Sequence, residues 1–215
     1  MRKIYLQLSL FALLSFTVSA QKDDSTKANK NGETIGIGIK AGLNFSNVSN
    51  VSGINGHSQT GFHAGLFIGG SSKHILTSRT ELLYSQQGYA FSTDSASGSN
   101  TLNYIMLAQL MAINITHFVQ IQFGVQMGYL LNAKIKSDMP STGIASADKI
   151  LDLYNRFDYG LAGGIEIHPI AGLLIGARYT MSMGDLYKPS DNGSANLGLS
   201  NSKNNVVQLF VGYRF

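Results

Sequence analysis

The carboxy-terminal residues 207–215 alternate apolar side chains with small or polar ones and end on an aromatic residue, Phe215. A period of two is typical of a β-strand that has one apolar face and one polar face. The same alternation returns from Thr34 onward and is most regular over residues 119–129, where Val, Ile, Phe, Met and Tyr oppose Gln and Gly. This pattern predicts a chain built almost entirely of two-faced strands.

Eight alternating segments are predicted after residue 33. They cover approximately residues 34–45, 61–69, 75–87, 101–113, 119–129, 155–167, 173–184 and 207–215. Long polar connections rich in Ser, Asn and Gly are expected at 46–59, 88–100, 135–154 and 186–204, and tight turns at 70–74, 114–117 and 168–172. Long loops at one end and short turns at the other are typical of an up-and-down membrane barrel. We therefore predict an all-β fold, an eight-stranded antiparallel transmembrane β-barrel, with ten strands if residues 135–154 contain a hairpin.

The charged residues of the predicted strands share the less apolar face. They are Lys40, Arg79, Glu81, Arg156, Asp158, Glu166, Arg178 and Arg214. An Arg or Lys that faces lipid at the bilayer midplane costs roughly 2–4 kcal/mol, so this segregation is what a membrane would enforce. Because eight strands enclose a space that side chains just fill, we expect these residues to project inward and pair as a lumen charge network.

The composition argues against other classes of protein. Charged residues make up 13% of the sequence, about half of the roughly 25% that is usual in soluble domains. A soluble barrel would carry far more Lys and Glu on its polar face than the Gly and Gln found here. The formal net charge of +4 is small and dispersed, so it does not indicate a nucleic-acid partner. With no cysteine in the chain, stability must come from strand closure.

The amino-terminal segment is typical of a secretory leader. Arg2 and Lys3 precede an apolar stretch from Ile4 to Val18, and a small-residue site ends at Ala20, so we expect cleavage between Ala20 and Gln21. The apolar stretch falls short of the roughly 20 residues that a membrane-spanning helix needs. Residues 21–33 are polar and predict a flexible periplasmic tether. The predicted location is the bacterial outer membrane, with short turns periplasmic and long loops extracellular.

Several motifs together resemble the PorT-like outer-membrane β-barrel family of Bacteroidota, which belongs among small barrels of the OmpA and OmpX kind. They are Lys40-Ala-Gly-Leu-Asn-Phe45, Gly61-Phe-His-Ala-Gly-Leu-Phe67, Glu81-Leu-Leu-Tyr-Ser-Gln-Gln-Gly88, Gly124-Val-Gln-Met-Gly-Tyr-Leu-Leu131, Asp158-Tyr-Gly160, Gly163-Gly-Ile-Glu166 and Gly212-Tyr-Arg-Phe215. The resemblance covers the whole predicted barrel and implies its fold and location. In one departure, Tyr104-Ile-Met-Leu-Ala108 lacks the acid and the proline that the family often carries in its fourth strand.

The resemblance also bears on biogenesis and on function. The terminal aromatic pair, Tyr213 and Phe215, is similar to the signal that the barrel-assembly machinery reads in outer-membrane proteins. The family's namesake is an accessory factor in protein secretion and gliding. Aromatic girdles are expected at Tyr213 and Phe215 on the periplasmic side, and the outer girdle is expected at Tyr84, Tyr129, Tyr159 and Tyr187.

Candidate chemical sites are few. His74, His117 and His168 each lie at a predicted turn. Neighbouring turns are two strands apart, about 10 Å, whereas zinc requires its ligands within about 2 Å of one centre. His63 is expected to be the one histidine that faces the lumen and to be hydrogen-bonded there. Ser58 follows His57 in the first predicted loop, where a lipid-modifying enzyme could place catalytic groups, but no acid is positioned there and no Gly-x-Ser-x-Gly elbow exists.

These observations predict a protein that is not an enzyme and that has no cofactor, metal or catalytic residues. We expect a structural or surface-interaction role through the extracellular loops. The alternatives are a narrow pore for small solutes, a loop-based lipid-modifying enzyme, or a secretion and gliding accessory factor. Expected partners are outer-membrane lipid, the barrel-assembly machinery and an unidentified surface or periplasmic protein.

Overall fold

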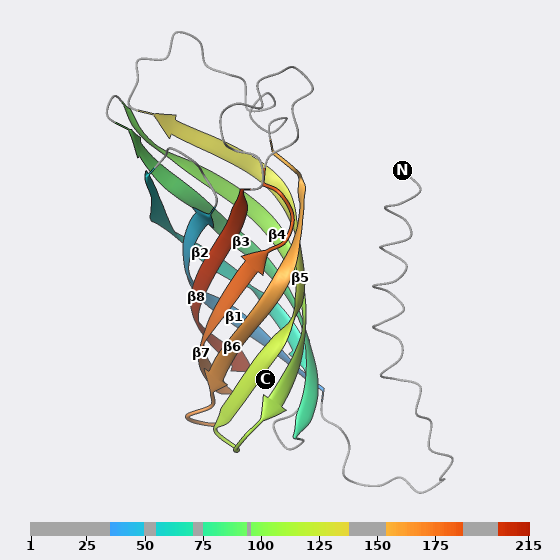
Figure 1. Ribbon diagram of the computed structural model, residues 1–215. Helices are drawn as coiled ribbons and strands as arrows, with labels where there is room; N and C mark the ends of the chain where they lie inside the picture. Colours follow the sequence, from blue (N-terminus) through green and yellow to red (C-terminus); the bar gives the residue numbers. More distant parts are fainter. Residues whose placement is uncertain (1–34, 50–54, 71–74, 94–95, 138–153, 187–201) are drawn as a thin grey trace, which may run out of the picture. The chain divides into compact units, whose positions relative to one another are not determined.

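The computed structural model describes residues 35–49, 55–70, 75–93, 96–137, 154–186 and 202–215. Eight antiparallel strands pair in sequence order, and the last pairs with the first to close the barrel (Figure 1). Closure runs from Gly38, opposite Arg214, to Ser49, opposite Lys203. The predicted fold class is therefore confirmed. None of the described residues forms a helix long and apolar enough to cross a membrane.

The strands are short on one side of the barrel and long on the other. They are β1 (Gly36–Ser49), β2 (Asn55–Gly69), β3 (Leu76–Thr93), β4 (Ala96–Asn114), β5 (Val119–Ser137), β6 (Phe157–Ile167), β7 (Leu173–Ser182) and β8 (Lys203–Arg214). We call the end that carries the β2–β3, β4–β5 and β6–β7 connections the turn end, and the opposite end the loop end. Strands β3 to β5 have 18, 19 and 19 residues, whereas β6 to β8 have 11, 10 and 12.

Consequently, β3, β4 and β5 rise beyond β6, β7 and β8 at the loop end, as the green and yellow arrows of Figure 1 show, and the start of β2 accompanies them, because Asn55 pairs with Ser92 of β3. This corrects the predicted loop at 88–100, because β3 and β4 stay paired from Leu76 and Ile113 out to Thr93 and Ala96. Most of the predicted loop at 46–59 is also strand, since β1 runs to Ser49 and β2 starts at Asn55. The proposed extra hairpin at 135–154 falls largely on residues 138–153, outside the described residues.

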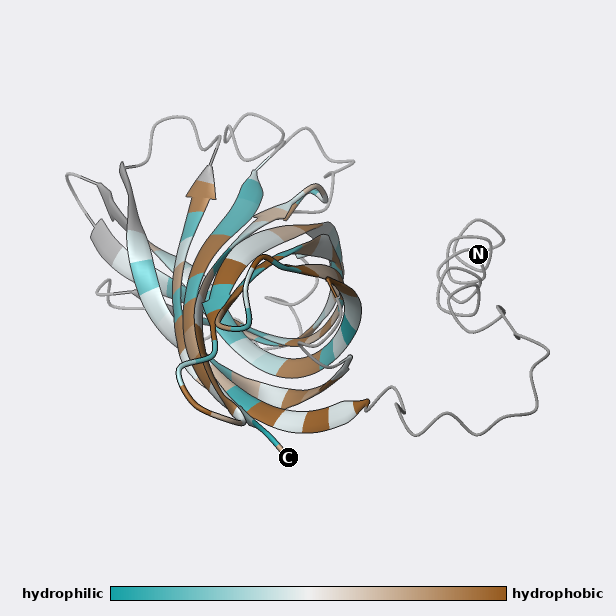
Figure 2. Cartoon of the chain, turned by 90° about the horizontal axis from the view of Figure 1, so that it is seen from below, coloured by the Kyte–Doolittle hydropathy of each residue, from teal (hydrophilic) through white to brown (hydrophobic). Residues whose placement is uncertain are grey.

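Inward and outward side chains alternate along each strand, and apolar bands recur on the wall in Figure 2. Apolar side chains cover the outward face; among those at least 45% exposed are Ile37, Ile39, Leu43, Phe62, Leu66, Ile68, Leu82, Phe123, Leu161, Ile165, Leu209 and Val211. Charged and amide side chains point inward, where Lys40, Glu81 and Gln122 are at most 2% exposed. The barrel thus holds its charged groups inside and presents an apolar face outside, the reverse of a soluble barrel.

Aromatic residues lie at both ends of the wall. Tyr213 and Phe215 are in edge contact at the turn end, with ring centroids 5.5 Å apart. Tyr159 faces outward near the loop end of β6, and Tyr129 faces outward near the middle of β5; both are about half exposed. Tyr84 faces outward near the middle of β3 and packs against Phe62, with ring centroids 5.8 Å apart. The fourth residue of the expected outer girdle, at position 187, lies outside the described residues.

Candidate functional site in the barrel lumen

Glu81 of β3 is fully buried in the lumen, and three ion pairs of the lumen converge on it. Arg178 of β7 donates to both of its oxygens, with Nη1 2.6 Å from Oε2 and Nη2 2.8 Å from Oε1. Lys40 of β1 donates from Nζ to Oε2 at 3.0 Å. Arg79, which is two residues away on the same strand, places Nη1 4.0 Å from Oε1. Three cations from three strands therefore surround one carboxylate.

Glu166 of β6 is the second buried carboxylate. Arg79 donates to it with both terminal nitrogens, at 2.6 Å from Nη1 to Oε2 and 2.9 Å from Nη2 to Oε1. His168, at the turn end, places Nε2 2.9 Å from Oε1 of Glu166. Because Arg79 also lies near Glu81, it stands between the two carboxylates. We call Lys40, Arg79, Glu81, Glu166 and Arg178 the lumen ion-pair cluster.

Two glutamines of β5 complete the cluster. Gln122 donates from Nε2 to Glu166 Oε2 at 2.9 Å and accepts from Arg178 Nη2 at 2.8 Å, so one amide joins both carboxylate groups. Gln120 accepts from Arg79 Nη2 at 3.3 Å and from Gln122 Nε2 at 2.8 Å. A charged group loses its hydrogen bonds to water when it is buried, and hydrogen bonds of this kind replace them. The cluster is therefore satisfied by protein groups drawn from several strands around the ring.

Aromatic rings pack against the cations. The Nζ of Lys40 lies 3.6 Å from the ring centre of Phe210, and the guanidinium carbon of Arg178 lies 5.4 Å from the same ring. Arg79 stacks in the same way on Phe67, at 4.7 Å. A ring face attracts a cation, and this attraction strengthens when water is excluded. Phe67 and Phe210 thus fill space and stabilise positive charge at once.

A neutral polar layer lies on the loop-end side of the cluster. Asn44 of β1 donates to Ser85 Oγ at 3.0 Å, and its Oδ1 lies 2.8 Å from His63 Nδ1 and 3.2 Å from Gln208 Nε2. Beyond it, Asn204 donates to Gln87. His63 is therefore hydrogen-bonded inside the barrel, as the sequence predicts. Together the two layers fill the bore with side chains from β1, β2, β3, β5, β6, β7 and β8.

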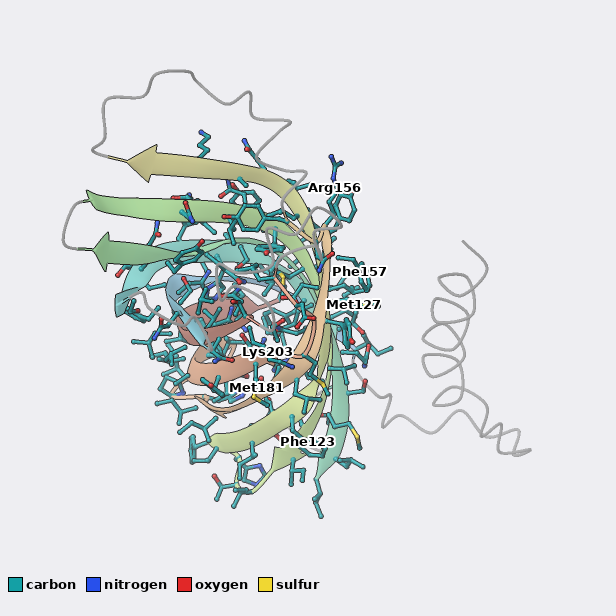
Figure 3. All side chains as sticks on the ribbon, turned by 45° about the horizontal axis from the view of Figure 1, so that its top comes forward. Phe123, Met127, Arg156, Phe157, Met181 and Lys203 are labelled. Carbon is teal, nitrogen blue, oxygen red and sulfur yellow. The ribbon has the colours of Figure 1, made fainter. Side chains whose placement is uncertain are left out.

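Five of the eight residues proposed for the lumen charge network meet in the cluster, and three do not. Arg156 precedes β6, is exposed, and lies beside Phe157 at the outside of the wall (Figure 3). The predicted segment begins two residues too early there, since the strand begins at Phe157. Asp158 is partly buried and hydrogen-bonds to Ser182. Arg214 is partly buried beside Gly36 at the turn end, and no ion pair with it is found within the described ranges.

Sequence reasoning missed the inner face of β4. Its inward residues are apolar and buried: Leu102, Tyr104, Met106, Ala108, Leu110 and Ala112. Met106 occupies the inward position where the resembled family often has an acid. In the loop half, Leu102, Tyr104 and Met106 pack with Leu83 and Leu130 in one apolar cluster. The available signal was the run of apolar residues on both faces of 102–113, which marks a strand without a polar side.

The histidines at the predicted turns do not converge. His117 is exposed in the turn between β4 and β5, whereas His168 lies against Glu166. The histidine at position 74 lies outside the described residues. Both carboxylates of the cluster are already saturated by donors, so the arrangement is suited to joining the walls of the barrel rather than to acid–base chemistry.

The geometry agrees with a comparison of the sequence with known families. Residues 19–188 match the model of a family described as outer membrane protein beta-barrel domain. The chain belongs to this family. As an outer membrane β-barrel protein it resides in the outer membrane, and its apolar outward face is lipid-facing. The sequence matches none of the curated proteins with which it was compared.

Solved outer membrane proteins are similar to this barrel at low sequence identity. Ail, the attachment invasion locus protein of Yersinia pestis, is 16% identical over 84% of this chain and 99% of that chain, with a TM-score of 0.45. Neisserial surface protein A is 13% identical over 83% and 97%, with a TM-score of 0.49. OprG from Pseudomonas aeruginosa is 12% identical over 86% and 97%, with a TM-score of 0.40.

Proposed function

We propose that this protein is a non-conducting, non-enzymatic outer-membrane barrel that acts through its loop-end surfaces. The observation that carries the proposal is the lumen ion-pair cluster. Glu81 and Glu166 are fully buried, and the arginines that bind them, Arg79 and Arg178, are each 2% exposed. A solute that crossed the bore would have to separate buried ion pairs, which is costly in a water-poor interior. A lumen closed in this way leaves the outer surfaces to carry the activity.

The raised part of the wall supports the same proposal. Strands β3, β4 and β5 continue past the last paired residues of β6, β7 and β8, so they form a sheet that projects beyond the closed ring (Figure 1). Such a sheet adds surface at the loop end without adding anything to the membrane-spanning ring. A narrow pore, the alternative function, would have no use for this projection.

A complementation experiment separates the two functions. Replacing residues 91–98 by Asn-Gly would join Ala90 to Ser99, which face one another across the hairpin, through a two-residue turn. This shortened variant should leave the lumen untouched and should fail to restore the envelope detergent tolerance of a deletion strain. Glu166→Gln, which alters the lumen alone, should restore it. The opposite pattern would favour the pore.

The orientation and the leader belong to the same proposal. The loop end is extracellular, the turn end is periplasmic, residues 1–20 are removed between Ala20 and Gln21, and residues 21–33 form a periplasmic tether. The alternation of long and short connections supports this arrangement, because small outer-membrane barrels place short turns in the periplasm. Amino-terminal sequencing of the purified mature protein should give Gln21 as the first residue; an intact Met1 would exclude a cleaved leader.

We also propose that the protein is related to the PorT-like barrels of Bacteroidota. An accessory role in secretion or gliding is the alternative function that this relationship suggests. The motif from Glu81 to Gly88 supports the kinship physically. Glu81, Ser85 and Gln87 each make a polar contact in the lumen. Gly88 lies so close to β4 that a Cβ there would come within 1.9 Å of the Asn100 carbonyl oxygen. Secretion defects in a deletion strain, rescued by the wild type, would select this role.

A further inference from the structure

A polar cluster lies on the lipid-facing wall, among apolar outward side chains. Gln109 of β4 accepts from Thr80 Oγ1 at 2.6 Å and donates to Ser78 Oγ at 2.7 Å. The inward neighbours Arg79 and Leu110 are at most 2% exposed, so Ser78, Thr80 and Gln109 occupy the outward positions of the two strands. We call these three residues the outer polar cluster.

The cluster lies within the apolar belt rather than at its edge. Toward the turn end, it is followed by Leu76 and Met111, which are 55% and 45% exposed; toward the loop end, it is followed by Leu82, which is 52% exposed. At about 3.3 Å per residue and a strand tilt of about 40°, Gln109 stands about 13 Å above Asn114, the last residue of β4. An apolar band of about 25 Å therefore encloses the cluster.

The fold gives no reason for polar groups at this place. Outward positions at the same level on neighbouring strands are Ile68, opposite Thr80, and Val125, opposite Gln109. Hydrocarbon offers no hydrogen bonds, so polar side chains within a membrane are costly and are commonly retained for contact with another protein. The hydrogen bonds within the cluster lower this cost, but its groups can still donate further hydrogen bonds. A glutamine amide has two N–H donors and a serine hydroxyl has one, and neither the second N–H of Gln109 nor the Ser78 hydroxyl has an acceptor in the described part of the chain.

From these observations we propose that the outer polar cluster is a lateral self-association site, at which β3 and β4 of one barrel meet β3 and β4 of a second copy. The chemistry of the hydrogen-bonding groups indicates which partner would bind here. Hydroxyl and amide groups donate and accept, so the cluster is complementary to itself across a two-fold axis, as an isologous interface requires. A headgroup phosphate would instead call for cationic residues, and the cluster has none. Leu82 and Met111 would supply the apolar rim of the contact.

The absence of cysteine from the sequence makes the test direct. Met111→Cys places one thiol beside the cluster, because Met111 lies opposite Ser78. Ile165→Cys is the control, since Ile165 on β6 is also lipid-facing and is 57% exposed. Both variants are oxidised in isolated outer membranes and run on non-reducing gels, after unboiled samples have confirmed that each barrel is folded. We expect several-fold more covalent dimer from Met111→Cys than from Ile165→Cys.

Removing the hydrogen-bonding groups should abolish the difference. Thr80→Val with Gln109→Leu, added to Met111→Cys, should lower dimer formation to the level of Ile165→Cys; Thr80→Val alone serves if the combined variant does not fold. Equal cross-linking at the two positions, or cross-linking that survives the loss of both polar side chains, would overturn the proposal. An adduct at Met111→Cys with a protein of different mass, without dimer, would also overturn it and would indicate a different partner.

Discussion

Arg178 on β7 and Glu81 on β3 form a two-pronged ion pair across the bore, with nitrogen–oxygen distances of 2.6 and 2.8 Å. In the closed ring of eight strands, β3 and β7 are four places apart and therefore lie on opposite walls. The pair thus ties the barrel together across its diameter, whereas backbone hydrogen bonds join only neighbouring strands. This ion pair therefore stabilises the barrel and also obstructs the bore.

Glu81→Ala should be strongly destabilising, because it leaves Lys40 and Arg178 buried beside one another without their shared carboxylate. Removing one partner of a buried ion pair costs about 3–5 kcal/mol. The free energy of unfolding, measured by urea titration of protein folded in lipid vesicles, should fall by that amount. Lys134→Ala, at an exposed position on β5, is the control and should change little. A loss below about 1 kcal/mol for Glu81→Ala would show that the cluster does not support the fold.

Gln122→Leu should weaken the barrel to a smaller extent. This change removes the amide that joins Glu166 to Arg178, and a buried partner left unsatisfied costs about 1–3 kcal/mol. Gln109→Leu is a matched control, because it makes the same substitution on the lipid-facing side of the wall. At a low protein-to-lipid ratio the control should be neutral or stabilising in the same urea titration. Equal losses for the two glutamines would contradict the bridging role of Gln122.

Gly88→Ala should disturb the long β3–β4 hairpin. An added Cβ would lie 1.9 Å from the Asn100 carbonyl oxygen, a distance that real structures do not tolerate, so the backbone must shift. Gly163→Ala is the control, because the nearest atom to a Cβ there, the Gln122 carbonyl oxygen, is 3.9 Å away. Hydrogen exchange should show faster exchange in residues 88–100 of Gly88→Ala and no change in Gly163→Ala. Unchanged protection in both variants would mean that the close approach is not needed.

The sequence predicted the barrel, its strand order and the inward face of its charges, because a period of two is visible without any knowledge of partners. It could not predict which charges would meet. Lys40 on β1 and Arg178 on β7 lie far from Glu81 in sequence, and only the folded ring brings them to it. Alternation assigns a side chain to a face, but it does not show where a strand begins, which is why Arg156 was misplaced.

The β3–β4 hairpin shows a second limit. Residues 88–100 are rich in Ser and Gly and have no apolar alternation, so the sequence predicts a loop there. In the structure residues 88–93 and 96–100 continue the pairing of β3 and β4, and Asn100 donates to the hydroxyl of Tyr89 within the hairpin. Where a strand extends beyond the membrane, neither of its faces contacts lipid. Apolar residues are therefore not required at every second position, and the sequence shows no period of two.

Membrane orientation can be tested with single thiols in this cysteine-free chain. Lys134→Cys, near the loop end of β5, should react with a membrane-impermeant maleimide in intact cells. His117→Cys, in the exposed turn between β4 and β5, should react only after the outer membrane is broken. We expect this order because short turns face the periplasm in barrels of this kind. Labelling of His117→Cys in intact cells, with Lys134→Cys protected, would reverse the proposed orientation.

The central claim, that the ion-paired lumen closes the barrel, is tested most directly by single-channel recording of the purified protein in planar bilayers. The wild type should show no stable conductance, because Glu81 and Glu166 hold arginines from the facing walls across the bore. The combined variant Glu81→Gln and Glu166→Gln, which loses both negative charges, should show flickering openings if it remains folded. A large and steady current through the wild-type protein would contradict the account and make the barrel a pore.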